Sequence, residues 1–396
     1  MRKKELVVVN IVVGLMVVVF ALITIRLSIN QDIPSLIASF FRSQAEDKTV
    51  AKEAAACSKK EPMKFSAKED DPHLLKLKEY QSVCGSFVTN KLMIFTGFPK
   101  DAAMAEADAK IIADKLILFN KAGVTPIVIA EPYAEDGAVS YKNFLNGAYD
   151  QAFQVYFQKI REAGVSDEMM GTWVPFPESN TPEWNNKDTE PRDFALCVNK
   201  YLAMLKSQFP NAKGSILLSA TTYDPNDIEY NNGDYIDLTP YVQDLDKSLV
   251  TSLGIQGFPW VSNASVKRRE VFKASEFLQP DLAISAAREM RTRDIWFNTG
   301  SFATKYAQDD KKRVSISSTE RKAILNSILD VASSLRNYQQ NEYRISINIF
   351  SEDKSEAGEA TDWSYFQSVD SKAVLKEFLA KVNDLEIPLS LYDKKK

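Results

Sequence analysis

Short apolar runs alternate with longer stretches of helical periodicity from about residue 86 onward. Seven runs have the length and the apolar content of buried strands. They are residues 92–95, 126–130, 172–176, 215–219, 253–258, 294–297 and 345–349. An eighth is expected around Gly147 or at residues 282–285. Because strands that alternate with helices pair in parallel, the pattern predicts an α/β fold, a (β/α)₈ TIM barrel rather than an open doubly wound sheet.

The N-terminal residues carry a different pattern. Residues 6–27 are almost wholly apolar and long enough to cross roughly 30 Å of hydrocarbon as a helix. Arg2, Lys3 and Lys4 precede this run, which predicts a cytoplasmic N-terminus and an extracytoplasmic barrel. A cleaved signal peptide is the alternative, although the apolar run is longer than usual and no small-residue cleavage site follows it.

These patterns divide the chain into three regions. Residues 1–29 are predicted to be a basic tip and a single-pass membrane anchor. Residues 30–85 are expected to form a polar stalk or linker, since their central part is rich in Lys, Glu, Ala and Ser. Residues 86–396 are assigned to the barrel.

Composition and charge exclude several classes of function. The formal net charge is −4, so no global basic field attracts nucleic acid. The chain contains one histidine, His73, which we expect at the surface of the polar N-terminal region. A Ser-His-Asp hydrolase or a multi-histidine zinc site is therefore not expected. No Gly-x-Gly-x-x-Gly or Walker-type loop opens a predicted helix, so nucleotide binding has no support.

The three cysteines do not have metal-ligand spacing, and we expect neither a metal nor a cofactor. Cys197 shares a helical face with Phe194 and Tyr201, which predicts a small buried apolar residue. Cys57 and Cys84 flank the start of the predicted barrel. They could form a disulfide if this region lies outside the cytosol, and the sequence leaves that pairing open.

Polar and aromatic residues follow the predicted strands closely, and in a barrel these strand ends form the face that carries active sites. Glu178 follows the run 172–176 and is the candidate general acid, because glycosidic cleavage needs a carboxyl group to protonate the leaving oxygen. Further candidate contacts to a sugar are Glu131, Tyr133, Asn180, Trp184, Tyr223, Asp224, Trp260, Asn298, Glu352, Asp353 and Trp363. The alternative is that strand ends simply expose polar side chains. Trp173 and Trp296 lie within predicted strands and are expected in the core.

Four stretches resemble the family 26 glycoside hydrolases, which are β-mannanases and related β-glucanases. They are residues 123–133, residues 146–150, residues 176–180 with Trp184, and residues 254–258. The resemblance implies that Glu178 is the acid/base, that Asn180 is a neighbouring polar contact and that Trp184 is a sugar platform. It also implies that residues 254–258 belong to the sixth strand.

The chain departs from this family at named positions. Pro177 stands where the family has a histidine, and Phe258 stands where it has a tyrosine. The family has a nucleophilic glutamate near the end of the seventh strand. If residues 293–300 are that strand, only Asn298 or Thr299 is available there, and neither can act as the carboxylate.

Three functional interpretations remain open. The first is an active glycosidase on a β-linked polysaccharide with a relocated second carboxylate: Glu352 is preferred, with Asp353, Asp224 and Glu131 as alternatives. Carboxyl groups about 5 Å apart would suit a retaining enzyme, and groups roughly 6.5–9.5 Å apart an inverting one. The second is an inactive barrel that binds polysaccharide through aromatic residues. The third is a structural component at the cell surface.

Overall fold

The computed structural model describes residues 57–58, 60–65, 71–134, 137–181, 190–223, 232–258, 273–300, 305–306, 314–315, 317–338, 343–351, 361–362, 365–366 and 368–392. The chain divides into two compact units, Met1–Ala55 and Ala56–Lys396, and all of the described residues belong to the second. The predicted membrane anchor at residues 6–27 lies outside them. No helix within the described ranges has the length and apolarity needed to cross a membrane.

Eight parallel strands close into a barrel in which the last strand pairs with the first. In chain order they are β1 (Lys91–Thr96), β2 (Thr125–Ala130), β5 (Thr172–Pro175), β6 (Lys213–Ser219), β9 (Val250–Gln256), β10 (Asp294–Thr299), β13 (Arg344–Ile349) and β15 (Leu389–Tyr392). Each strand pairs with the next one in this order. The predicted (β/α)₈ barrel is therefore confirmed.

The predicted position of the eighth strand was wrong. Gly147 lies in a turn with a φ of 89°, between α5 (Tyr141–Leu145) and α6 (Asp150–Glu162). Residues 282–285 lie within α10 (Pro280–Met290), where a proline in the first turn and apolar residues at helical spacing favour a helix. The eighth strand is instead the short segment β15.

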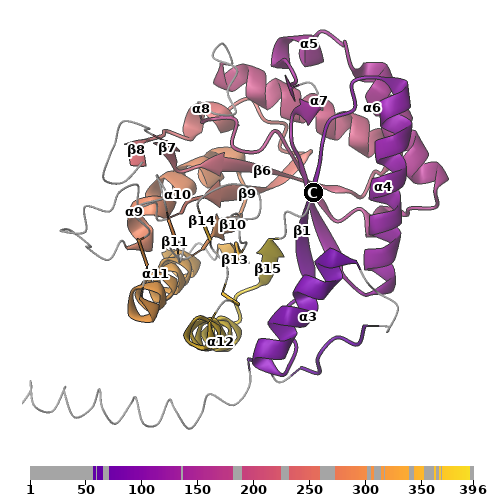
Figure 1. Cartoon of the computed structure of the whole chain (residues 1–396). Helices are drawn as coiled ribbons and strands as arrows, with labels where there is room; N and C mark the ends of the chain where they lie inside the picture. Colours follow the sequence, from indigo (N-terminus) through magenta and orange to yellow (C-terminus); the bar gives the residue numbers. More distant parts are fainter. Residues whose placement is uncertain are drawn as a thin grey trace, which may run out of the picture. The chain divides into compact units, whose positions relative to one another are not determined.

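Helices surround the strands (Figure 1). The longer ones are α4 (Ala102–Lys121), α6, α7 (Pro191–Gln208), α10, α11 (Ser318–Arg336) and α12 (Val369–Asp384). Shorter helical elements are η1 (Asp167–Met169), α8 (Thr239–Val242) and α9 (Ala274–Leu278). Two short antiparallel pairs join β3 (Tyr133–Ala134) to β4 (Gly137–Ala138) and β7 (Thr221–Tyr223) to β8 (Asn232–Tyr235). A third small sheet pairs β11 (Lys305–Tyr306) with both β12 (Val314–Ser315) and β14 (Thr361–Asp362). Local signals fix helix starts: the Asp101 carboxylate caps α4, and Ser317 with Glu320 forms a capping box on α11.

The core has two layers. One lies between the strands and the helices and contains Trp173, which is fully buried. The other fills the barrel interior and consists of Met93, Ile129, Val174, Leu217, Phe258, Trp296 and Phe350. Both tryptophans predicted for the core are thus buried. Gly254 is required beside Trp296, because a Cβ atom there would lie 2.4 Å from the indole ring.

The barrel unit begins earlier in the chain than predicted. Residues 72–84 were assigned to the stalk, but they form α3 (Pro72–Cys84), which contacts α12 and buries Leu74, Leu77 and Tyr80. A disulfide joins Cys57 to Cys84 and ties the preceding segment to this helix. The pairing that the sequence left open is therefore present. Cys197 is buried, as predicted, and takes no part in a disulfide.

His73 was predicted at the surface and is instead buried, with 3% of its surface exposed. It lies in the first turn of α3, where the Asp71 carboxylate accepts from its backbone N–H. Its ring meets Phe119 of α4 edge-on, with centroids 5.9 Å apart, and the Lys115 Nζ atom lies 3.4 Å from its Nε2. The prediction failed because it treated a helix packed on the barrel as part of a solvated stalk.

Candidate active site

Two of the predicted carboxylates follow neighbouring strands. Glu131 comes directly after β2 and Glu178 follows β5, and these strands pair with Ala130 opposite Pro175. Ile127 and Ile129 face the barrel interior, so the two-residue alternation of a strand places Glu131 on the same inward row. Its backbone N–H donates to the Thr96 carbonyl at 2.9 Å and continues the ladder with β1. Both side chains are half-buried at the C-terminal end of the barrel.

The segment after β5 has an unusual backbone. Phe176 and Glu178 adopt left-handed conformations, with φ values of 53° and 56°. Such a conformation costs an L-residue with a side chain about 1–2 kcal/mol. With this backbone conformation at residue 176, the Phe176 ring packs outside the barrel in a cluster with Phe98, Tyr141 and Phe144, at centroid distances of 4.9–5.2 Å. This burial holds the strained turn in place.

Hydrogen bonds clamp the same segment onto the neighbouring strand β6. The Glu178 N–H donates to the Leu217 carbonyl at 2.7 Å. The Asn180 side chain pairs with Ser219 in both directions, donating to its carbonyl at 2.8 Å and accepting from its N–H at 2.9 Å. Ser179 donates to the Phe176 carbonyl at 2.8 Å and contacts the Tyr141 hydroxyl. Burial raises the pKa of Tyr141, and the contact with Ser179 opposes that shift.

These contacts give Asn180 a role that the sequence did not suggest. The side chain is 5% exposed, and its amide completes the pairing of the loop with the end of β6. It therefore positions Glu178, which lies two residues earlier. Its predicted contact with a sugar stays a prediction.

A row of amides crosses the barrel interior below this end. Ser390 donates to Asn348 Oδ1 at 2.9 Å, Asn348 Nδ2 donates to Asn298 Oδ1 at 2.6 Å, and Asn298 Nδ2 donates to Gln256 Oε1 at 2.6 Å. Four successive strands, β15, β13, β10 and β9, supply these side chains. Asn298, a predicted substrate contact, is 2% exposed and engages both ends of its amide within this row.

The direction of the row follows from Met93. Its sulfur lies 3.8 Å from Asn348 Nδ2, and a thioether accepts hydrogen bonds but cannot donate them. The Asn348 nitrogen must therefore face Met93, and its carbonyl must face Ser390. Each later amide is oriented in turn. Gln256 at the end of β9 is half-buried and is left with its Nε2 donor outside the row.

Replacing Asn298 by leucine tests this row. The substitution removes the partner of the half-buried Gln256 Oε1 and leaves Asn348 Nδ2 with only the weak contact to the Met93 sulfur, and a buried polar group that loses its partner costs about 1–3 kcal/mol. We expect the free energy of unfolding in urea to fall by about 2–4 kcal/mol. Gln256→Leu, which removes only the half-buried end of the row, should cost less. Equal losses for the two variants would contradict the arrangement.

The order of the eight barrel strands shifts the positions at which the chain is compared with family 26. Residues 254–258 were compared with a sixth strand, but they end the fifth barrel strand, β9. The run 293–300 was taken as the seventh, but β10 is the sixth. The seventh strand is β13, and Glu352 follows its last residue, Ile349, by three positions in the sequence. Asn298 and Thr299 therefore lie on the sixth strand, so their lack of a carboxylate does not bear on the nucleophile that the family carries on its seventh strand.

The remaining candidates are distributed unevenly. Tyr133 begins β3, and its N–H donates to the Glu131 carbonyl at 2.7 Å. Tyr223 ends β7. Six predicted residues lie outside the described ranges: Trp184, Asp224, Trp260, Glu352, Asp353 and Trp363. Among the described residues, no group of His, Cys, Asp or Glu side chains could hold a metal ion.

No protein-family model matches the chain, and no curated protein matches it. Solved structures similar to it include the endo-β-1,4-mannanase from Thermotoga petrophila, at 9% identity over 78% of this chain and 73% of that one, with a TM-score of 0.44. The GH26 β-mannanase from Bacteroides ovatus shares 9% identity over 63% of this chain and 73% of that one, with a TM-score of 0.38.

A different kind of enzyme is also among the similar structures. The sugar phosphate isomerase/epimerase from Parabacteroides distasonis shares 11% identity over 82% of this chain and 97% of that one, with a TM-score of 0.39. At these identities and scores the similarity says nothing about the activity of this chain.

Proposed function

We propose that this barrel is a glycoside hydrolase-like protein acting on a β-linked polysaccharide, with Glu178 as general acid/base. The observation that carries the proposal is the backbone of Glu178. Glu178 is a non-glycine residue in a left-handed conformation at the C-terminal end of a barrel strand. Buried neighbours on both sides hold it there, so the fold maintains this backbone strain. Such strain is concentrated at functional sites, and this end of the barrel is where barrel enzymes act.

The second carboxylate has two candidates. Glu131 follows the adjacent strand, and neighbouring strands lie about 4.8 Å apart, so this pair suits the short separation of a retaining mechanism. Glu352 follows the seventh strand, where the resemblance expects the nucleophile. Glu352 lies outside the described residues, so it is a candidate from the sequence and from the resemblance. Asp224 and Asp353 stay sequence-based alternatives.

The test is hydrolysis by the full-length chain on a panel of mannans, β-glucans and peptidoglycan. Released reducing ends measure cleavage, and affinity electrophoresis on the same polymers measures binding. Cleavage that disappears in Glu131→Gln or in Glu352→Gln identifies the second carboxylate. Binding without cleavage would support an inactive carbohydrate-binding barrel. Absence of both would overturn the proposal and favour a structural role.

We also propose that the barrel lies outside the cytoplasm, anchored in the lipid bilayer through residues 6–27. The disulfide between Cys57 and Cys84 supports this, because disulfides persist in oxidising compartments and are rare in the cytosol. Digestion of intact cells with an added protease tests the proposal. We expect loss of the barrel from intact cells, and its protection there would contradict an extracytoplasmic location.

A further inference from the structure

The opposite, N-terminal end of the barrel holds a cavity of about 700 Å³. The first residues of seven strands line it: Lys91, Thr125, Thr172, Lys213, Asp294, Arg344 and Leu389. Ile127 and Trp296 line it from deeper in the barrel and give it an apolar floor. Small-molecule sites have volumes of about 300–1,000 Å³ and combine apolar surface with a few polar groups, and this cavity meets both conditions.

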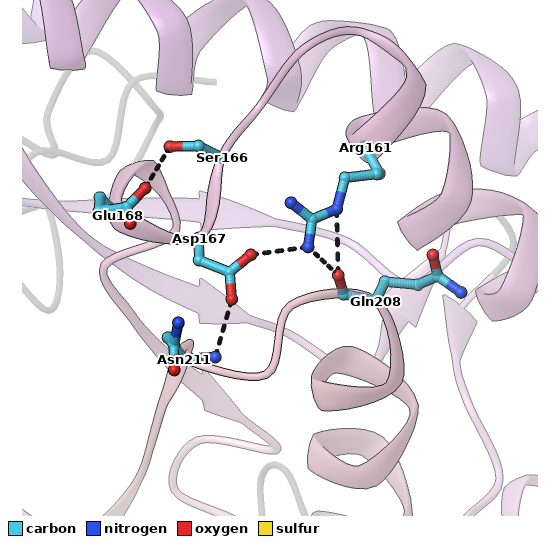
Figure 2. A network of polar contacts seen from close by, with 6 residues as sticks. All are labelled: Arg161, Ser166, Asp167, Glu168, Gln208 and Asn211. Atoms are coloured by element: carbon cyan, nitrogen blue, oxygen red, sulfur yellow. Dashed lines mark hydrogen bonds and ion pairs between the residues drawn. The ribbon is translucent and has the colours of Figure 1, made fainter.

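The acidic side chains at one side of the cavity already have partners (Figure 2). Asp167 accepts from Arg161 Nη2 at 2.6 Å and from the Asn211 N–H at 2.9 Å, and these hydrogen bonds hold its pKa below the usual range. Glu168 accepts from the Ser166 hydroxyl at 2.7 Å, which lowers its pKa. Arg161 also donates to the Gln208 carbonyl. These carboxylates are therefore satisfied within the fold.

The remaining acidic side chain, Asp294, is bound by the Arg344 guanidinium through both of its oxygens. Lys91 and Lys213 also line the cavity, and no ion pair joins either of them to a carboxylate in the described part of the chain. Burial lowers the pKa of Lys91, and the positive charge of Lys213 lowers it further, while Asp294 partly opposes the shift. The exposed Lys91 and Lys213 ammonium groups repel each other, while the three carboxylates that line the cavity are each bound to other groups of the protein.

We propose that this cavity binds a small organic anion, a phosphate or a carboxylate with an apolar body. Its charged group lies between Lys91 and Lys213, where it replaces their repulsion with two charge-assisted hydrogen bonds. Its apolar body rests on Trp296 and Ile127. The site is separate from Glu178, which lies at the other end of the same strands.

Phenyl phosphate is the probe. Inorganic phosphate and phenol are compared with it, because they represent its charged part and its apolar part separately. Isothermal titration calorimetry on the full-length chain, at constant ionic strength in chloride buffer, should give saturable binding of phenyl phosphate. Inorganic phosphate should bind more weakly, and phenol more weakly still. Lys91→Met and Lys213→Met should each weaken phenyl phosphate binding at least about tenfold, because each removes one charged contact and keeps its apolar stem.

Two controls separate this site from its alternatives. Lys110→Met removes an exposed lysine from α4 and should bind phenyl phosphate like the unmodified chain. Glu178→Gln should also bind it normally, since that change lies at the other end of the barrel. Lys91→Met should not lower the unfolding temperature in chloride buffer, since it relieves a repulsion. Absence of saturable binding, or equal weakening by Lys110→Met, overturns the proposal.

Discussion

Glu178→Gln is expected to reduce polysaccharide hydrolysis about 10²–10⁴-fold while leaving polysaccharide affinity nearly unchanged. Glutamine keeps the size and the polarity of the side chain but cannot give a proton to the glycosidic oxygen. The turn around residue 178 is held by the backbone bond to Leu217, by Asn180 and by the Phe176 ring. The substitution touches none of these contacts, so the loop should keep its conformation.

The leaving group distinguishes a proton donor from a residue that only positions the substrate. Aryl glycosides with acidic phenol leaving groups need little protonation, so Glu178→Gln should retain far more activity on them than on polysaccharide. Glu106→Gln, an exposed change of the same kind on α4, is the matched control. Equal losses on both substrates would refute the assignment of Glu178 as the acid.

Replacing Cys57 and Cys84 together by alanine is expected to lower the free energy of unfolding by about 3.5 kcal/mol. The bridge joins residues 27 positions apart, and closing a loop of that length removes about this much entropy from the unfolded chain. Chemical denaturation of the unmodified and the double variant measures the difference.

A reductant supplies the control for this second result. Dithiothreitol should lower the stability of the unmodified protein to that of the double variant and leave the variant unchanged. Cys197 is buried and unpaired in both proteins, so it contributes equally. An unmodified protein whose stability does not respond to the reductant would show that the bridge adds nothing measurable.

The barrel could be read from the sequence because buried parallel strands are apolar runs and their crossover helices have a 3.6-residue period. Two elements escaped that signal. The strand β15 has only four residues, which is too short for a pattern to stand out. The helix α3 buries His73 and Gln81 beside its apolar residues, so its buried face does not show as an apolar stripe.

The site was predictable only in part, for a related reason. Glu131 and Glu178 could be found because each follows a strand closely, and the structure brings them to adjacent strands. The left-handed turn could not be found, since Phe176 and Glu178 are residue types that seldom adopt it. Asn348 interrupts an isoleucine-rich strand. Its structural role could not be predicted, because its partners Asn298 and Ser390 are distant in the sequence and contact it only in the folded barrel.

The closure of the barrel by β15 constrains how the protein can be made. β1 pairs with β2 on one side and with β15 on the other, and β13 also needs β15. Until the ribosome has released residues 389–392, both strands present an unpaired edge to other chains. Truncation before Leu389 should therefore yield aggregates rather than a smaller folded domain.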